Sequence, residues 1–422
     1  MKRIFFNLNI FTGILIYIFM SCSEDPISDT SENKEWLPII KTVNGSLSST
    51  ENMRVLKLFG SHYEIGYAHG YLLGPEIFNR QESNLAKEGL LDFYVNQVLP
   101  NINQVHFPDE YYKEIHGMYD GVKARTPHDT LYSNILGRYI DYNDAIALNC
   151  LNAFASQGMC SSISIWGNMT EDSTVLTAYN HDCLISDGHT GQWYVIVRVP
   201  NEASGAIPMV CIGLAGDMNV HTGMNLNGVT LSCQAINTSN PSTSTTGFTS
   251  EGIIFRKLIE SVSAESPVEE IENVLNVLYG IEAEAVMMSW PNPVLNTNAV
   301  ALEIDGNLAD NHGFTIRYPE NNNPYMIQTN HFLIRYTPLP CARYNDIQAC
   351  LDSVAMGEKP PLSVDTAWRL LSLVRNGGDF LTEIAVVFEP EKKQMHVALA
   401  EPGIHAHECT IVILDIESLT AV

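Results

Sequence analysis

Basic residues are scarce in this sequence. Of its 422 residues, 23 are Lys or Arg and 48 are Asp or Glu, so the formal net charge is −25. A chain this acidic repels the phosphate backbone of DNA and RNA, which argues against a nucleic-acid-binding protein. The charge suits a soluble enzyme at a surface, but it identifies no substrate.

The sequence also lacks any pair of cysteines at CxxC spacing and any internal repeat. Its nine cysteines are scattered from Cys22 to Cys409, so a structural metal framework is not expected. One or two disulfides are permitted in an oxidising compartment, although their pairing cannot be assigned from spacing. With 45% apolar and 17% charged residues, the chain is globular and long enough for one large domain or two small ones.

The first residues have the pattern of a secretory signal. Lys2 and Arg3 precede an apolar run, Ile4 to Met20, that contains no acidic residue and ends at Ser21 and Cys22. The run is also close to the length of a membrane span, so an uncleaved anchor is the alternative. The cysteine at its end favours a lipoprotein signal over residues 1–21, with Cys22 lipidated. Residues 22–50 then form a polar tether without a core.

The predicted secondary structure changes at Cys160, from mainly helical to strands alternating with helices. Residues 51–159 are expected to be mainly helical, as in "SHYEIGYAHGYLLGPEI", where Ser61 is a candidate N-cap. From Cys160 onward, apolar runs typical of strands alternate with helices. One of these helices is expected to begin with Ser266 as its cap and Glu269 completing a capping box. Strands interleaved with helix pairs predict an α+β protein in which helices lie outside two sheets.

The cysteine at this change begins a predicted strand hairpin. Its first strand is "SSISIWG", and its second strand, "STVLTAYNHD", brings Asn180 and Asp182 back to the open end. Antiparallel pairing would place Asp182 close to Cys160. The simple alternative is a buried core cysteine, since free cysteine is among the most buried residue types.

The position of the thiol suits a chain that is cut between Met159 and Cys160. The thiol would attack the Met159 carbonyl, and hydrolysis of the resulting thioester would release an α-amine on Cys160. An α-amine has a pKa of about 8 and can accept the thiol proton. Nucleophile and base then belong to one residue, and no separate His–Asp pair is required.

Several motifs together resemble a known family. They are "YEIGYAHGYLLG", "YYKEIHGMYDG", "CSSISIWG", "YNHD", "TGMNLNGVTLS", "QTNHF", "CARY" and "IAVVFEPEKKQMHVALAEPG". In their order and spacing the chain resembles the acyl-coenzyme A:6-aminopenicillanic acid acyltransferase-like group of N-terminal-nucleophile hydrolases, which are related to choloylglycine hydrolase and acid ceramidase. The resemblance implies an αββα four-layer sandwich over residues 160–422, preceded by a helical pro-region over residues 51–159.

The resemblance also implies roles for residues around the nucleophile. Cys160 matches the autoproteolytic nucleophile, and Asp182 matches the aspartate that holds and orients its amine. Asn180, in the same motif, is a supporting hydrogen-bonding residue. Tyr179 stands where many relatives have an arginine, and a phenol cannot supply that positive charge. Strand alternation predicts that His181 faces away from Asn180 and Asp182, so His181 is assigned a structural or rim position.

Three further residues match an oxyanion-binding set. Asn225 matches an asparagine whose backbone N–H helps to form the oxyanion hole, and Asn330 matches one whose side-chain amide donates to the oxyanion. Arg343 matches an arginine that steadies the site. Each has an ordinary alternative: a hairpin turn for Asn225, a strand end for Asn330 and a surface ion pair for Arg343.

These observations predict an autoproteolytically activated cysteine amidohydrolase or acyltransferase in the cell envelope. It would act on linear amides or N-acyl compounds through a thioester on Cys160, without cofactor or metal, and its two chains would stay associated. The expected location is an outer-membrane lipoprotein, periplasmic or surface-exposed. Alternatives are a phospholipase-B-like or bile-salt-hydrolase-like enzyme, or a surface binding lipoprotein that performs no catalysis.

Overall fold

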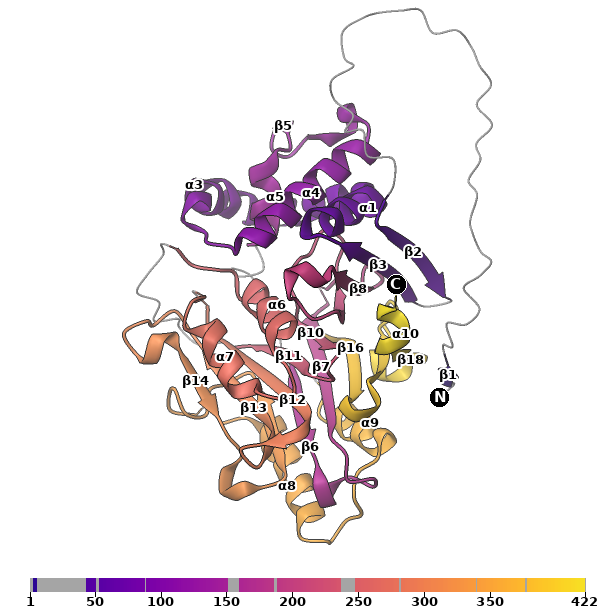
Figure 1. The fold of residues 1–422 in the computed structure, drawn as a ribbon, viewed down its shortest axis with the longest axis vertical. Coiled ribbons are helices and arrows are strands. Elements are labelled where there is room, and N and C mark those ends of the chain that lie inside the picture. Colours follow the sequence, from indigo (N-terminus) through magenta and orange to yellow (C-terminus); the bar gives the residue numbers. More distant parts are fainter. Residues whose placement is uncertain are drawn as a thin grey trace, which may run out of the picture.

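Two mixed β-sheets stack face to face and carry helices on both outer faces (Figure 1). The computed structural model describes residues 3–5, 43–50, 53–87, 89–150, 159–185, 188–236, 247–280, 282–338, 340–375 and 378–421. The predicted α+β class and the αββα layers are confirmed. The predicted signal segment lies almost wholly outside the described residues, as does Cys22.

The first sheet carries the predicted hairpin at its centre. Its seven strands have the order β1-β18-β17-β16-β7-β6-β15. Their bounds are β1 (Arg3–Phe5), β6 (Ser161–Ile165), β7 (Leu176–Leu184), β15 (Tyr325–Thr329), β16 (Phe380–Glu389), β17 (Gln394–Leu399) and β18 (Ile411–Asp415). The strands are antiparallel except for the parallel β1–β18 pair. Three pairs are local hairpins, β6–β7, β16–β17 and β17–β18, whereas the pairs β16–β7, β15–β6 and β1–β18 join segments that lie far apart in the chain.

The second sheet includes residues from both sides of the predicted cut. Its nine strands have the order β14-β13-β12-β11-β10-β9-β8-β3-β2. Their bounds are β2 (Gly45–Thr50), β3 (Met53–Gly60), β8 (Tyr194–Pro200), β9 (Met209–Gly213), β10 (Thr222–Asn225), β11 (Thr230–Ala235), β12 (Glu284–Val294), β13 (Thr297–Ile304) and β14 (Phe314–Arg317). Because β3 pairs in parallel with β8, the segment before Cys160 is part of the sandwich as well as a helical layer.

The helices divide between the two outer faces. The described helices are α1 (His62–Leu85), α2 (Leu90–Phe93), α3 (Leu99–Asn101), α4 (Asp109–Arg125), α5 (Tyr142–Leu148), α6 (Glu251–Ser261), α7 (Pro267–Leu275), α8 (Ala342–Ala355), α9 (Val364–Leu373) and α10 (Ile416–Thr420). Helices α1, α4, α6 and α7 share one apolar core with the second sheet, whereas α8 and α9 pack on the first. A small hairpin, β4 (Tyr132–Ser133) with β5 (Arg138–Tyr139), lies apart from both sheets.

Between the two sheets lies a third apolar cluster together with buried hydroxyl groups. The cluster joins Val195 and Met224 of the second sheet to Val386 and Phe388 of the first. Buried hydrogen-bonded hydroxyls also connect the sheets, since Thr177 on β7 contacts Ser289 on β12 at 2.7 Å. Polar atoms buried this way need partners, and pairing across the gap fixes the register of one sheet on the other.

Glycines bring α1 and α4 into direct backbone contact. A Cβ atom built on Gly70 would lie 2.0 Å from the carbonyl oxygen of Met118, and one on Gly117 would lie 2.1 Å from that of Tyr63. No side chain fits in these spaces. The glycines of "YEIGYAHGYLLG" and "IHGMYDG" recur every four residues on one helix face, and they let the two backbones touch.

The two predicted helix starts have different outcomes. Ser61 caps α1, as predicted, and Glu64 also completes a capping box there. Helix α7 does begin at Pro267, but the Ser266 side chain makes no capping hydrogen bond, so the predicted capping box with Glu269 is wrong. The carboxylate of Glu270, one residue later, instead accepts hydrogen bonds from the backbone N–H and hydroxyl of Ser263.

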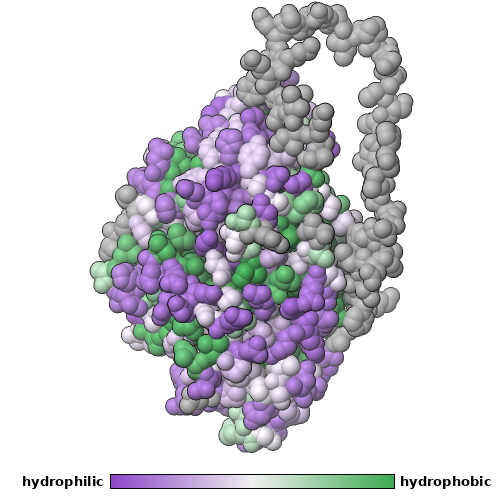
Figure 2. Space-filling model, viewed as in Figure 1, coloured by the Kyte–Doolittle hydropathy of each residue, from purple (hydrophilic) through white to green (hydrophobic). Residues whose placement is uncertain are grey.

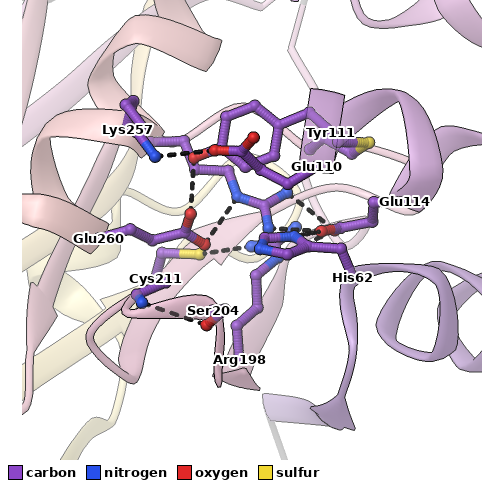
Figure 3. Close-up of polar contacts among 12 residues, drawn as sticks. His62, Glu110, Tyr111, Glu114, Arg198, Ser204, Cys211, Lys257 and Glu260 are labelled. Atoms are coloured by element: carbon purple, nitrogen blue, oxygen red, sulfur yellow. Dashed lines mark hydrogen bonds and ion pairs between the residues drawn. The ribbon is translucent and has the colours of Figure 1, made fainter. Parts of the chain in front are cut away.

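A buried ionic cluster joins the helices that precede Cys160 to the layer that follows it (Figure 3). The Arg256 guanidinium on α6 donates both to Glu114 on α4, at 2.6 and 2.8 Å, and to Glu260 at 2.9 Å. His62 contacts Glu114 at 2.9 Å, and the Tyr111 hydroxyl donates to Glu260 at 2.6 Å. Burial raises the pKa of Glu114, but Arg256 and His62 outweigh burial and hold it well below its usual range.

On the face shown in Figure 2, hydrophilic residues surround several hydrophobic patches. In the described part of the chain, no helix combines the length and apolar character needed to cross a membrane. The eight cysteines described there are all free, so none of the permitted disulfides forms among them.

Removal of the buried cation from the ionic cluster should destabilise the fold strongly. Arg256→Met removes the guanidinium that is hydrogen-bonded to both Glu114 and Glu260 and leaves Glu114 only its 3.8 Å contact with Arg198 and its contact with His62, so we expect a loss of about 3–5 kcal/mol. Urea unfolding of the purified protein measures this loss. Lys257→Met is the matched control, because its partly exposed pair with Glu110 contributes about 1 kcal/mol or less. Equal losses in the two variants would contradict the assigned importance of the cluster.

Candidate active site

The β6–β7 hairpin places Cys160 beside Asp182, as the sequence predicts. Ser161 pairs with Asn180 and Ser162 with Tyr179 in antiparallel register. One step further, the backbone N–H of Met159 donates to the carbonyl oxygen of Asp182 at 2.9 Å. Both sides of the Met159–Cys160 bond are therefore held by the end of a regular ladder.

Strand alternation divides the residues of this hairpin between two faces. Ala178 and Ile163 face the helices α8 and α9, and Asn180 follows them, with its amide donating to the Leu371 carbonyl at 2.9 Å. The other face looks into the space between the sheets, where Gln234 of β11 donates to the Ser162 hydroxyl at 2.8 Å. The Cys160 thiol lies on this inner face.

Arg343 binds the residues around the predicted cut. From the first turn of α8, one of its terminal nitrogens donates to the carbonyl oxygens of Met159, at 2.7 Å, and Cys160, at 2.6 Å, and to the hydroxyl of Ser161 at 2.8 Å. The other nitrogen donates to the side-chain oxygen of Asn330 at 2.8 Å. A charge-assisted donor thus rests on the carbonyl that the thiol would attack.

Asn330 joins this group from the end of β15. Its side-chain oxygen accepts from Arg343, and its side-chain nitrogen donates to the carbonyl oxygen of Ala235 at 2.7 Å. The structure therefore brings together Cys160 before β6, the backbone carbonyl of Asp182 on β7, Asn330 after β15 and Arg343 on α8. This is the majority of the predicted set.

Tyr179 and His181 form the polar surroundings of the thiol. Cys160 is 2% exposed, and burial raises its pKa to about 12, so the thiol is protonated in the uncut chain. The Tyr179 hydroxyl lies 3.6 Å from Sγ, and Nδ1 of His181 also lies 3.6 Å from it. The Tyr179 hydroxyl and Nδ1 of His181 also contact each other at 3.0 Å, so the sulfur, the hydroxyl and the imidazole nitrogen are all within hydrogen-bonding distance of one another.

His181 lies among aromatic rings and sulfur atoms. Its Nε2 is 3.0 Å from Sγ of Cys183, and its ring meets the Trp193 indole edge-on. Burial of the ring, together with the nearby His221, lowers the pKa of His181 to about 3. The imidazole is therefore neutral at physiological pH, although the residue keeps some exposure to solvent.

Two predicted site residues lie elsewhere. Asn180 points away from the thiol, into the contact with α9 described above. Asn225 ends β10 at a hairpin turn, and its backbone N–H donates to the carbonyl oxygen of Val229 at 2.9 Å, so this N–H is already paired. The Asn225 amide donates to the carbonyls of Ile259 and Val262 at the end of α6. The geometry supports the alternative of a hairpin turn and argues against the oxyanion role.

His181 is the residue of the site that the sequence interpretation missed. The predicted alternation is confirmed, because His181 faces away from Asn180. However, the face it occupies is the one that holds the thiol. The strand register could have shown this. Cys160 and Ser162 are two residues apart and so lie on the same face of the sheet, and Ser162 pairs with Tyr179 on β7. Cys160, Tyr179 and His181 therefore share a face.

The site presents donors for nucleophilic catalysis and no evident metal ligands. Among the residues that the structure describes, no group of three or more His, Cys, Asp or Glu side chains is arranged to hold a metal ion. What the arrangement offers is a thiol, a neutral imidazole and a guanidinium around a single peptide bond.

No protein-family model and no curated protein matches the chain. Similar solved structures include an N-acylethanolamine-hydrolyzing acid amidase ortholog from Caenorhabditis elegans, 14% identical over 55% of this chain and 93% of that one, with a TM-score of 0.40. A variant of the conjugated bile acid hydrolase from Clostridium perfringens is 13% identical over 62% and 94%, with a TM-score of 0.42. Penicillin V acylase from Agrobacterium tumefaciens is 13% identical over 62% and 88%, at 0.40. The function is therefore argued from the site of this chain itself.

The position of Asn225 generates a prediction about stability. Asn225→Ala removes hydrogen bonds to two backbone carbonyls at the end of α6 and two that its side-chain oxygen accepts within the turn, and we expect a loss of about 1–3 kcal/mol in urea unfolding. The folded variant should still be cut before Cys160. Asn227→Ala, at an exposed position of the same turn, should have little effect. A stable Asn225→Ala protein in which the cut fails would restore the site role.

Proposed function

We propose that the chain is the precursor of a cysteine amidohydrolase that activates itself by cutting the Met159–Cys160 bond. The observation that carries the proposal is the Arg343 guanidinium, which donates to the Met159 carbonyl immediately before a buried thiol. A peptide carbonyl bound by a cation and adjacent to a nucleophile has the elements of an acyl-transfer site.

Self-cleavage follows from these contacts. Sγ of Cys160 attacks the carbonyl carbon of Met159, and the negative charge that develops on its oxygen is stabilised by Arg343. Collapse breaks the C–N bond, and the amine of Cys160 leaves with a proton while the acyl group remains on sulfur as a thioester. Water then hydrolyses the thioester and yields a carboxylate on Met159 and a free thiol.

The released amine supplies the base for later turnover. An α-amine with a pKa of about 8 is partly unprotonated at neutral pH and can take the proton of its own thiol. Asp182, whose carbonyl holds Met159 in the uncut chain, is well situated to orient this amine. An acyl substrate would form a thioester on Cys160, and release of the acyl group to water, or to an amine acceptor, completes the cycle.

The uncut chain is expected to be inactive toward substrates. Its thiol is buried and protonated, and its nitrogen is part of a peptide bond, so neither an accessible nucleophile nor an amine base exists. After the cut, the two chains should stay together, because β3, α1 and α4 share the apolar core and the ionic cluster with the later segments.

We further propose that the protein is anchored in the cell envelope through lipid on Cys22, with the polar residues after it as a tether that ends before β2 (Gly45–Thr50), which belongs to the second sheet. The support is the apolar run that ends at Ser21 and Cys22. Linear amides and N-acyl compounds are the proposed substrates.

The proposed cut is tested by mass spectrometry of the purified full-length protein. We expect a C-terminal chain that begins at Cys160 and copurifies with its N-terminal partner, and we expect Cys160→Ala to remain uncut. A Cys160→Ala chain cut at the same bond would refute self-cleavage.

Turnover is tested on the same preparation with penicillin V, taurine- and glycine-conjugated bile acids and long-chain N-acyl amino acids. Release of the amine by the cut wild type and not by Cys160→Ala is the expected result. An uncut wild-type protein that binds these compounds without releasing amine would support the binding-protein alternative instead.

The anchor is tested by labelling cells with a radioactive fatty acid. Wild-type protein should incorporate label, and Cys22→Ser should incorporate none, because the thiol is the proposed attachment point. Label that persists in Cys22→Ser would exclude the assignment.

A further inference from the structure

The uncut chain lacks the base that the cut chain acquires. Before cleavage, the nitrogen of Cys160 is a peptide nitrogen, which has no basic lone pair. The thiol nevertheless has to lose a proton when it attacks the Met159 carbonyl, and burial raises its pKa to about 12. The first reaction of the molecule therefore needs a proton acceptor other than the α-amine.

Two side chains lie within hydrogen-bonding distance of the sulfur on the inner face of β7. The Tyr179 hydroxyl is fully buried, and burial raises its pKa well above 10, so it remains neutral and acts as a donor or a relay. Nδ1 of His181 is 3.6 Å from the sulfur and 3.0 Å from the Tyr179 oxygen. The sulfur thus has both a direct and a relayed path to one imidazole nitrogen.

Cys183 can set the tautomer of this imidazole. Nε2 of His181 lies 3.0 Å from Sγ of Cys183. A proton on Nε2 that is donated to this sulfur leaves the lone pair of Nδ1 directed at Cys160 and Tyr179. In this tautomer His181 is an acceptor aimed at the thiol.

We propose that His181, assisted by Tyr179, is the base of the self-cleavage step and passes the thiol proton to the leaving amine. This inference rests on the proposed function and adds a residue to it. As Sγ bonds to the Met159 carbon, the thiol proton moves to Nδ1 of His181, directly or through the Tyr179 hydroxyl. When the C–N bond breaks, the same proton moves from Nδ1 to the departing nitrogen of Cys160, and His181 is neutral again.

The surroundings of His181 favour its neutral form, so the ring carries the proton only during the cleavage step. The titratable groups facing it are Cys160 and Tyr179 on one side, Cys183 on its own strand, and His189 and His221 from neighbouring segments. Burial lowers the pKa of His181 to about 3, and the two histidines add to this effect. The ring is therefore neutral, and the lone pair of Nδ1 is available. Because the ring is a weak base beside a thiol with a pKa of about 12, it takes the proton only as Sγ bonds to the Met159 carbon, and its conjugate acid then readily protonates the amine.

This assignment predicts different pH profiles for the two reactions. The base of self-cleavage stays neutral at every pH above about 3, so the rate of the cut should change little between pH 8 and pH 5. Turnover depends on an amine with a pKa of about 8 and should fall as the pH drops through that value, because the amine becomes protonated. A base with the ordinary pKa of histidine would instead make the cut slow down below about pH 6.5.

The test follows the cut over time in the full chain made by cell-free synthesis, with the fraction cut read from a gel. His181→Gln should slow the cut by about a hundredfold or more, the usual effect of losing a general base. Tyr179→Phe should slow it by a smaller factor, because the direct path from sulfur to Nδ1 remains. His116→Gln, on the exposed face of α4, is the matched control and should be cut at the wild-type rate.

Chemical rescue separates proton transfer from a structural role. His181→Gly should be cut slowly, and added imidazole should restore part of the rate, which a purely structural contact would not allow. Cutting of His181→Gln at the wild-type rate would overturn the inference, and so would the absence of rescue in a folded His181→Gly protein. If the wild type itself remains uncut, the proposed function fails, and this result is distinguishable from either outcome.

Discussion

The hydrogen bonds of Arg343 are the contact on which the site depends. One guanidinium holds the carbonyls of Met159 and Cys160, the hydroxyl of Ser161 and the side chain of Asn330. It thereby fixes the start of β6 to the end of β15 and the first turn of α8. These partners are all neutral, so the positive charge of the guanidinium is not cancelled by a hydrogen-bonded carboxylate and stays available for charge that develops on the Met159 oxygen.

Contacts outside the site join the residues before Cys160 to those after it, as the proposed cut requires. The segment before Cys160 supplies β2 and β3 to one sheet and packs α1 and α4 on its outer face. Glu114 from this segment and Arg256 from the later one form a buried pair that is costly to separate, since separation would break a buried network of charges that also includes Glu260 and Arg198. The peptide bond at Met159 is therefore not what holds the two parts together, and it can be consumed by the reaction.

How far the sequence predicts this structure depends on whether the signal is local. The hairpin from Ser161 to Asp182 and the capping box at Ser61 were predictable, because each is set by residues close together in the chain. The cap at Ser266 failed since a competing carboxylate, Glu270, folds back on Ser263. The strand β3 was missed although it forms a local hairpin with β2; its place in the sandwich depends on the parallel pairing with β8, which lies more than a hundred residues away.

Residue roles within the site divide along the same line. Cys160, Asp182, Asn330 and Arg343 meet in space, whereas Asn225 serves a turn whose hydrogen bonds to α6 no local pattern reveals. His181 was predicted on the correct strand face but outside the site, although Cys160 lies on that same face. The two faces of β7 make different contacts. On one face the amide of Asn180 donates to the Leu371 carbonyl of α9, and on the other Tyr179 and His181 contact the Cys160 sulfur. The proposed self-cleavage needs a base on the same strand face as the sulfur before an amine exists, and alternation with a period of two puts His181 on that face.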